Sequence, residues 1–197
     1  ISVITPTATV DLAVYETTDN ADALHLQRAS LVVDFEPGAV LIGDVSDLFN
    51  QGDRTYVGRA VEGVSNLATL EINLQPGAEE IRFQDGVLGG RYQQIGNKIF
   101  DTVAIPPGER VAFVSYRLPT EGTSFALTPT FAYPVGQMNL LVADLPGIKV
   151  DAPGLTQQSV EDIQGRSYQL WVGTAPAAGL QVKIDGILEA GSVDPRD

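Results

Sequence analysis

Acidic side chains at short spacing are the feature of this sequence that best fits a metal site. Calcium takes carboxylate and carbonyl oxygens from loops. The chain offers two groups of such residues, which are Glu16, Asp19, Asn20 and Asp22 in the first and Asp44, Asp47, Asn50 and Asp53 in the second. The spacing of three in the second group suits a short helical turn with its oxygens on one side. We therefore name Asp44, Asp47 and Asp53 as candidate calcium ligands, although acids also gather without a metal in a chain of net charge −13.

The sequence contains few of the residues and motifs on which enzymatic catalysis depends. The chain has one histidine, His25, and no cysteine, so a Ser-His-Asp triad has one candidate base and the usual transition-metal ligands are too few. The sequence contains neither a Gly-x-Ser-x-Gly elbow nor a Ser-x-x-Lys motif nor a Gly-Lys-Ser/Thr phosphate loop. We expect the chain not to be an enzyme.

Large aromatic and arginine side chains are the residues most often used as anchors in protein interfaces. Arg54, Tyr56, Tyr92, Tyr133 and Trp171 are the candidates for partner contact. Each of them also fits a purely structural role. Trp171, which lies in an alternating segment, is either a core anchor or a contact surface on which a sugar could stack.

The elements that must position these residues are β-strands. Gly and Pro total 32 residues and would interrupt long helices, whereas alternating apolar segments recur throughout the chain. The alternation over 24–27 changes phase before 31–35, which predicts a bulge near residues 28–30. Residues 111–114 are apolar on both faces and indicate a central strand covered on both sides. Short helical turns are expected near 45–49 and 159–163.

Residues typical of turns lie between these strands. Pro-Gly occurs five times, and such pairs favour type II turns with a positive φ at the glycine. Asn50-Gln51-Gly52-Asp53 also predicts a turn with a positive φ at Gly52, followed by a strand from Thr55. Segment 117–123 has the composition of a linker. We therefore expect an N-terminal β-sandwich over 1–118, a smaller C-terminal one over 119–190 packed firmly against it, and a polar tail over 191–197 that extends away.

Charge and hydropathy restrict the partners. An acidic chain without a basic cluster disfavours nucleic acid and anionic membrane surfaces. The apolar runs are shorter than the ~18–20 residues of a membrane-spanning helix. The sequence begins at Ile1 rather than at Met, from which we expect a processed product whose leader or anchor lies outside this chain.

Several turn and strand signatures between residues 23 and 186 carry a family resemblance. They are Gly52-Asp53-Arg54-Thr55-Tyr56-Val57-Gly58, Leu74-Gln75-Pro76-Gly77-Ala78, Phe83-Gln84-Asp85-Gly86, Phe100-Asp101-Thr102 with Pro106-Pro107-Gly108, and Phe113-Val114-Ser115-Tyr116-Arg117-Leu118-Pro119. The chain resembles exported bacterial β-sandwich proteins of the immunoglobulin-like or carboxypeptidase-regulatory-like kind, which are often tethered by a membrane anchor. The resemblance implies a fold and a compartment, and it carries no catalytic residues.

From these observations we expect an all-β protein made of two packed immunoglobulin-like sandwich units and located outside the cytoplasmic membrane. The expected function is a non-enzymatic structural or interaction module of an envelope or surface assembly. It would bind protein partners through sheet faces or through edge strands. The alternative is a module that binds carbohydrate or calcium.

Overall fold

The computed structural model describes residues 13–174, 180–194 and 196, and within them the chain is all-β, with no helix. No segment of this part of the chain forms a helix long and apolar enough to cross a membrane. The strands are β1 (Thr17–Thr18), β2 (Leu24–Glu36), β3 (Ala39–Asn50), β4 (Thr55–Tyr56), β5 (Leu70–Asn73), β6 (Glu79–Phe83), β7 (Tyr92–Ile95), β8 (Lys98–Asp101), β9 (Gly108–Pro119), β10 (Ser124–Leu127), β11 (Val135–Ala143), β12 (Lys149–Asp151), β13 (Leu155–Ile163), β14 (Arg166–Gly173) and β15 (Val182–Asp185).

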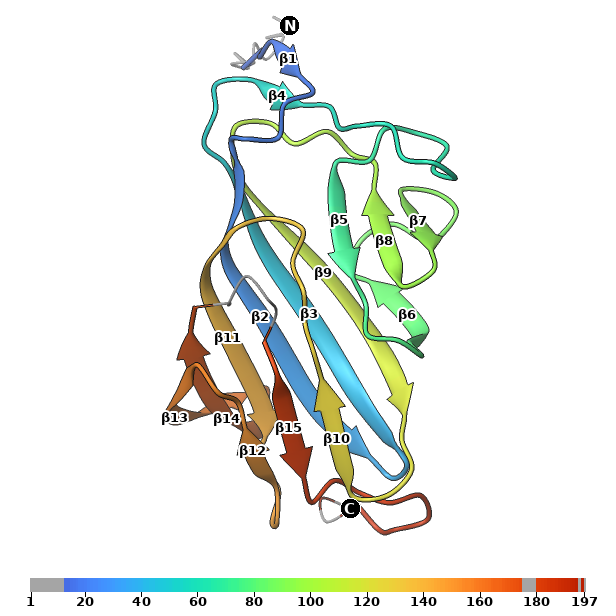
Figure 1. Ribbon diagram of the computed structural model, residues 1–197, viewed down its shortest axis with the longest axis vertical. Coiled ribbons are helices and arrows are strands. Elements are labelled where there is room, and N and C mark those ends of the chain that lie inside the picture. Colours follow the sequence, from blue (N-terminus) through green and yellow to red (C-terminus); the bar gives the residue numbers. More distant parts are fainter. Residues whose placement is uncertain (1–12, 175–179, 195, 197) are drawn as a thin grey trace, which may run out of the picture.

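A seven-stranded sheet is the centre of the molecule (Figure 1). Its order is β13-β14-β11-β2-β3-β9-β6, and β2, β3 and β9 are its longest strands. All neighbouring pairs are antiparallel except β11 and β2, which run parallel. Strands from both sides of the boundary expected at residue 118 therefore join one sheet. The division into two sandwich units stays a prediction, but β11, β13 and β14 of the second unit extend the sheet of the first.

Two three-stranded sheets, β10-β15-β12 and β5-β8-β7, add the second layer, and a short pair joins β1 to β4. Leu70, Ile99, Leu127 and Ile184 of these small sheets are buried in the same core cluster as the long strands. We call the side of the seven-stranded sheet that faces this core the inner face and the opposite side the outer face. The all-β architecture of packed sheets that the sequence predicts is confirmed.

The change of apolar phase along β2 has the expected cause. The register between β2 and β3 shifts between Leu26 and Arg28, which is the position of a bulge. One extra residue there turns the following residues over, so that Leu24 and Leu26 before it and Leu31 and Val33 after it are all buried. The predicted bulge is confirmed, a little before the position expected from the sequence.

Both expected helical turns are wrong. Residues 45–49 lie within β3, where every residue from 39 to 50 is paired with both β2 and β9. Residues 159–163 lie within β13, which is paired with β14. Ser, Glu and Asp give a weak local preference for a helix start, and pairing with long neighbouring strands overrides it.

The turns are partly as predicted. Glycine follows proline at five turns, and every one of these glycines has a positive φ, as Gly38, Gly77, Gly108, Gly147 and Gly154. Gly52, however, is not among the positive-φ residues. The loop that follows β3 is instead held by the buried Asn50, whose side chain donates to the carbonyls of Arg54 and Ile105 and accepts from the Gly52 amide at 3.0 Å.

Candidate interaction surfaces

The outer face of the seven-stranded sheet carries a band of apolar side chains. Cross-strand pairing places Val45 beside Phe113 and Val32 beside Leu141 on this face. Leu41, Val45 and Phe113 are half-buried, and they belong neither to the core nor to the side chains that pack against it. We call the residues Val32, Leu41, Val45, Phe113 and Leu170 the outer band; Leu141 beside Val32 is 9% exposed and belongs to the core cluster.

Local packing fixes the shape of the outer band. Gly43 lies at its centre, and a Cβ placed there would come 3.5 Å from the Phe113 ring and 3.7 Å from Val32 Cβ. The Phe113 ring therefore lies over the bare backbone of Gly43. Neighbouring strands lie about 4.8 Å apart, and each residue adds about 3.3 Å of length. The outer face of β11, β2, β3 and β9 together therefore measures roughly 800 Å². That is about the area each partner contributes to a standard protein interface.

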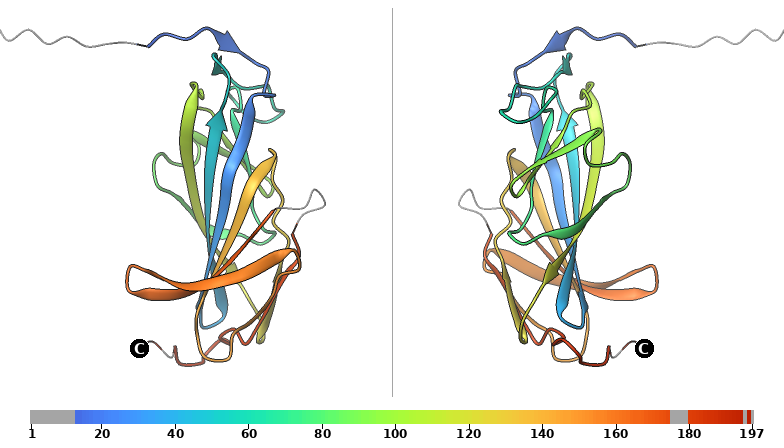
Figure 2. Two further views of the ribbon diagram at one scale, coloured as in Figure 1. Left: turned by 90° about the vertical axis from the view of Figure 1, so that its left-hand side faces the viewer. Right: turned by 90° about the vertical axis from the view of Figure 1, so that its right-hand side faces the viewer.

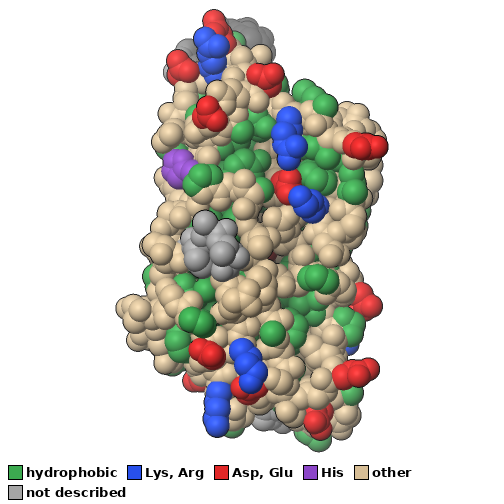
Figure 3. Space-filling view, viewed as in Figure 1, with side chains coloured by type: hydrophobic (Ala, Val, Ile, Leu, Met, Phe, Trp, Pro, Cys, Tyr) green, Lys and Arg blue, Asp and Glu red, His purple; other side chains and the backbone are tan. Residues whose placement is uncertain are grey.

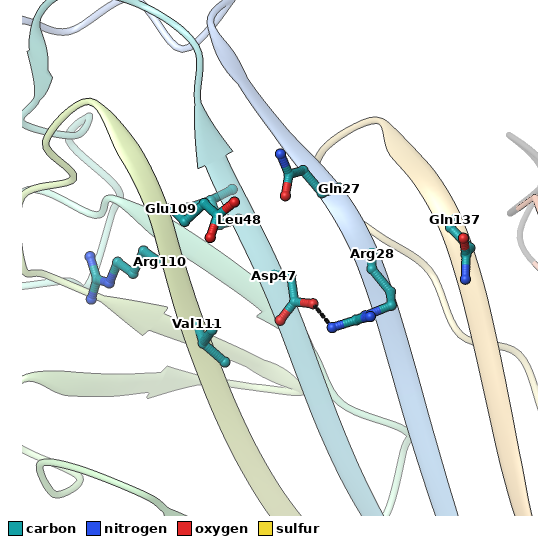
Figure 4. Close-up of a pocket in the computed structure, with 8 residues that line it drawn as sticks. All are labelled: Gln27, Arg28, Asp47, Leu48, Glu109, Arg110, Val111 and Gln137. Atoms are coloured by element: carbon teal, nitrogen blue, oxygen red, sulfur yellow. Dashed lines mark ion pairs between the residues drawn. The ribbon is translucent and has the colours of Figure 1, made fainter.

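A polar hollow of about 410 Å³ opens on the outer face beside the bulge of β2 (Figure 4). Arg28 on β2 and Asp47 on β3 form an ion pair of 2.5 Å across its floor. Gln27, Glu109 and Gln137 also line it. Arg110 points away from this ion pair (Figure 4) and binds a buried carboxylate on the inner side. The hollow is thus polar, with one internal ion pair and the acidic side chain of Glu109, and it lies next to an apolar band.

A second group of charged side chains lies at the end of the outer face opposite the polar hollow. The Asp34 carboxylate is 6% exposed and accepts hydrogen bonds from Arg166 and, at 2.6 Å, from Arg196. Arg196 also donates to the Phe35 carbonyl. The tail expected to extend away is therefore joined to the sheet at Arg196, which shares the buried Asp34 carboxylate with Arg166.

The strands β13 and β14 form a hairpin that leaves the body of the molecule (Figure 2). We call residues 155–173 the arm. Its two turn residues, Gln164 and Gly165, both have positive φ, at 56° and 79°, as a two-residue type I′ hairpin turn requires. In β13 only Leu155 is buried, and the eight residues after it are exposed. After Leu155, β13 therefore contributes nothing to the core, whereas β14 buries Tyr168 and packs Leu170 and Trp171 against it.

The three candidate calcium ligands do not meet. Asp44 and Asp47 lie on opposite faces of β3, since Asp44 is buried on the inner face and Asp47 pairs with Arg28 on the outer face. Asp53 lies in the exposed loop beyond the strand. Within the part of the chain that the structure describes, no group of three or more His, Asp or Glu side chains is arranged to hold a metal ion. The premise of a helical turn, which put these oxygens on one side, was the error.

Asp44 is instead a buried carboxylate with a single polar partner. Its Oδ1 accepts a hydrogen bond from the Ser46 hydroxyl at 3.2 Å, and no ion pair joins it to a cation among the described residues. Burial raises the pKa of Asp44 from 3.8 to about 6, although the Ser46 hydrogen bond acts in the opposite direction. Because the pKa of Asp44 is raised in the folded chain, the free energy of unfolding depends on pH through this group.

Two of the predicted contact residues are buried. Tyr92 is fully buried, stacks on Phe83 with ring centroids 3.9 Å apart, and donates a hydrogen bond to Asp85. Burial, assisted by the Asp101 charge, raises the pKa of Tyr92 to about 12. Tyr56 is 2% exposed. Neither side chain can contribute much area to a partner, because aromatic residues of high β propensity are also the residues that fill a sheet core.

The other three predicted contact residues occupy varied positions. Arg54 is exposed and forms an ion pair of 3.0 Å with Glu16. Tyr133 is half-buried and lines a hollow of about 500 Å³ with Tyr56, Arg59 and Glu71. Trp171 lies on β14, half-buried against the core, and its indole Nε1 is buried without a hydrogen-bond partner. Tyr56 and Tyr133 are thus brought together, whereas Arg54, Tyr92 and Trp171 are not part of one site.

The outer band was not predicted from the sequence, although one apolar segment of β9 indicates it. Val111-Ala112-Phe113-Val114 is apolar on both faces, which we interpreted as cover on both sides. In the structure Ala112 and Val114 are buried, while Val111 is 59% exposed and Phe113 half-buried. The same pattern arises when one face of a strand is reserved for contact outside the chain.

The chain was compared with protein families, curated proteins and solved structures, and only the solved structures gave matches. No protein-family model matches the chain, and no curated protein matches it. Among solved structures the chain is similar to an M1 zinc metallopeptidase from Deinococcus radiodurans, with 13% identity and a TM-score of 0.49 over 83% of this chain and 42% of that one. It is also similar to a two-domain M1 zinc metallopeptidase variant bound to L-tryptophan, with 12% identity and a TM-score of 0.50 over 83% and 43% of the two chains. The chain thus spans less than half the length of these structures, and likeness at this identity concerns the fold alone.

Proposed function

We propose that this chain is a non-enzymatic structural and interaction module of an assembly outside the cytoplasmic membrane, in the cell envelope or at the cell surface, and that it binds a protein partner through its outer face. The observation that carries the proposal is the outer band, an apolar stripe on the face opposite the core. Large apolar stretches on a protein surface, rimmed by polar groups, are typical of interaction sites. The proposed location rests on the resemblance to exported β-sandwich proteins.

The arrangement of charge on this face supports a protein partner. Arg28 with Asp47 at one end and Arg166 and Arg196 with Asp34 at the other are already paired within the chain. The apolar centre with a paired, polar rim resembles the anatomy of protein interfaces. A partner can cover the band while these charges keep their partners within the chain.

A substitution within the outer band tests the proposal. Val45→Asp places a charge in the centre of the band, and Val87→Asp makes the same change at a side chain that is 67% exposed in a loop. Tagged wild-type chain and both variants, expressed in the native cells, are compared by size-exclusion chromatography of envelope extracts. We expect the wild type and Val87→Asp in a larger complex and Val45→Asp free. A complex that is retained by Val45→Asp, or is absent for all three proteins, contradicts the proposal.

Carbohydrate binding is the second candidate function, and the hollow beside Tyr133 favours it. Tyr56, Tyr133 and the Arg59–Glu71 ion pair of 3.0 Å line this space of about 500 Å³, and sugar sites combine an aromatic surface with charged hydrogen-bonding groups. Screening on a glycan array checks it. Binding that is lost in Tyr133→Ala and kept in Tyr15→Ala, an exposed tyrosine elsewhere, would support this function.

A further inference from the structure

The free edge of β13 is a second interaction surface, separate from the outer band. β13 is the last strand in the order of the seven-stranded sheet and pairs only with β14. Ordering a residue costs roughly 1–2 kcal/mol of backbone entropy, yet eight of the nine residues in β13 stay exposed. Core burial therefore does not explain why the arm is so long.

The two edges of the sheet differ in how they are protected. β6, at the far edge, has five residues, a register shift between Glu79 and Arg82, and a positive φ at Glu80. Its charges are paired, as Arg82 with Glu80 and Arg117 with Glu79. Short length, a bulge and charged side chains are devices that prevent strand addition. β13 has nine residues and contains neither Lys, Arg nor Pro, and its devices are a bulge between Gln157 and Val160 and two acidic side chains, Glu161 and Asp162.

After the bulge, residues 160–163 of β13 alternate regularly between the two sides of the arm. Val160 and Asp162 point to one side of the arm, and Glu161 and Ile163 to the other. Val160 and Ile163 are 54% and 39% exposed. Glu161 accepts a hydrogen bond from the Ser159 hydroxyl at 2.5 Å and Asp162 one from the Gly165 amide at 3.0 Å, but neither carboxylate forms an ion pair with a described residue. Each side of this edge thus presents one apolar and one acidic side chain.

We propose that the edge of β13 accepts an extended strand of a partner protein that carries two adjacent Lys or Arg residues between two apolar residues. Such a strand places a cation opposite Glu161 on one side and opposite Asp162 on the other, and an apolar side chain opposite Val160 and Ile163. Opposite charges directly across a strand pair stabilise it, and like charges destabilise it. The net charge of −13 also favours the approach of a cationic partner.

The same pattern disfavours a second copy of this chain as the occupant. Antiparallel pairing of residues 160–163 with themselves would place Glu161 opposite Asp162 twice, acid against acid. The acids therefore select against self-association while they attract a basic strand. The inference rests on the proposed function in one respect only, namely that the chain is an interaction module, and it uses a different surface.

The probe is a labelled peptide with the core Val-Lys-Lys-Val, flanked by threonines, and its counterpart with the core Val-Glu-Glu-Val. Binding to the whole chain is followed by fluorescence anisotropy at low and physiological salt, and located by amide shifts in NMR spectra. We expect the lysine peptide to bind at least tenfold more tightly than the glutamate peptide, with the largest shifts at Val160–Ile163. Higher salt should weaken the binding.

Charge reversal supplies the matched control. Glu161→Lys/Asp162→Lys changes the arm, and Asp53→Lys/Glu62→Lys makes the same change of net charge at two exposed residues elsewhere. We expect the arm variant to prefer the glutamate peptide and the control to behave as the wild type. Equal loss in both variants would reduce the effect to net charge and overturn the inference, as would shifts outside β13 or binding of neither peptide. Because Val45→Asp leaves this edge intact, failure of the outer face and failure of the β13 edge are measured separately.

Discussion

The two ends of the seven-stranded sheet use charge in opposite ways. At the β9–β6 end, Arg110 of β9 donates to Asp101 of β8, which belongs to the small sheet β5-β8-β7. This carboxylate is fully buried and also accepts hydrogen bonds from Arg91 at 2.7 and 3.0 Å and from the Val103 amide at 2.9 Å. In β13, Glu161 and Asp162 are exposed, and neither forms an ion pair with a described residue. Charge that is desolvated and paired thus holds the fold together at one end, whereas the exposed acids at the other end have no cationic partner among the described residues, which is the basis of the proposed recognition edge.

The largest effect is expected at the buried end. Asp101→Asn removes the negative charge between Arg91 and Arg110, which leaves Arg110, 13% exposed, without a carboxylate and Arg91, 19% exposed, with Asp85 alone. Breaking such a buried pair costs about 3–5 kcal/mol of the free energy of unfolding. The measurement is urea denaturation. The matched variant Asp162→Asn, at the exposed end, should stay within about 0.5 kcal/mol of the wild type; equal losses in the two variants would remove the distinction between the ends.

A second expected effect concerns Asp44, which is buried between the two ends without a cation. With its pKa raised from 3.8 to about 6, the folded chain keeps this proton while the unfolded chain releases it. The free energy of unfolding should therefore fall by about 2 kcal/mol as the pH rises from about 4 to about 6, and by about 3 kcal/mol over the whole range from about 3 to about 7. Asp44→Asn should abolish this part of the pH dependence, and Asp53→Asn in the exposed loop should retain it. Denaturation curves across this pH range that coincide in slope for the wild type and Asp44→Asn would show that Asp44 is not buried in this way.

A smaller, local effect is expected in the arm. Gly165 has a φ of 79°, and an added Cβ would meet nothing within 4 Å, so Gly165→Ala should act through backbone strain alone, at about 1–2 kcal/mol. The hairpin should then open more often, and amide hydrogen exchange over Val160–Ile163 should accelerate roughly fivefold or more while β3 amides keep their rates. Faster exchange in β3 as well would mean that the arm and the body unfold together.

The smallest effect is expected for the charge reversal of the arm. Glu161→Lys/Asp162→Lys should leave the free energy of unfolding within about 0.5 kcal/mol of the wild type, because both side chains are exposed and β13 buries only Leu155. Thermal and urea denaturation measure this. A loss of several kcal/mol would place the arm among the elements that hold the fold together and would weaken its assignment as a recognition element.

The strands and turns could be predicted because their signals are local. Alternation, the phase change before Leu31 and the Pro-Gly pairs each report on a few neighbouring residues, and the structure confirms them. The surfaces could not be predicted, because they depend on pairing between distant strands. Val32 and Leu141 become neighbours only when β2 pairs in parallel with β11, and residues 159–163 resemble a helix start until β14 pairs with them. Asp44 and Asp47 were grouped by spacing, whereas a strand sends them to opposite faces.

Photo-crosslinking in the native cells tests the central claim, that the outer face is the docking surface, most directly. Benzoylphenylalanine replaces Phe113 on the outer face in one protein and Phe125 on β10 in another, since both are half-buried phenylalanines on different sheets. The account predicts one discrete crosslinked species for the Phe113 position, lost on adding Val45→Asp, and none for the Phe125 position. A species from Phe125 alone, or the same species from both positions, would contradict it.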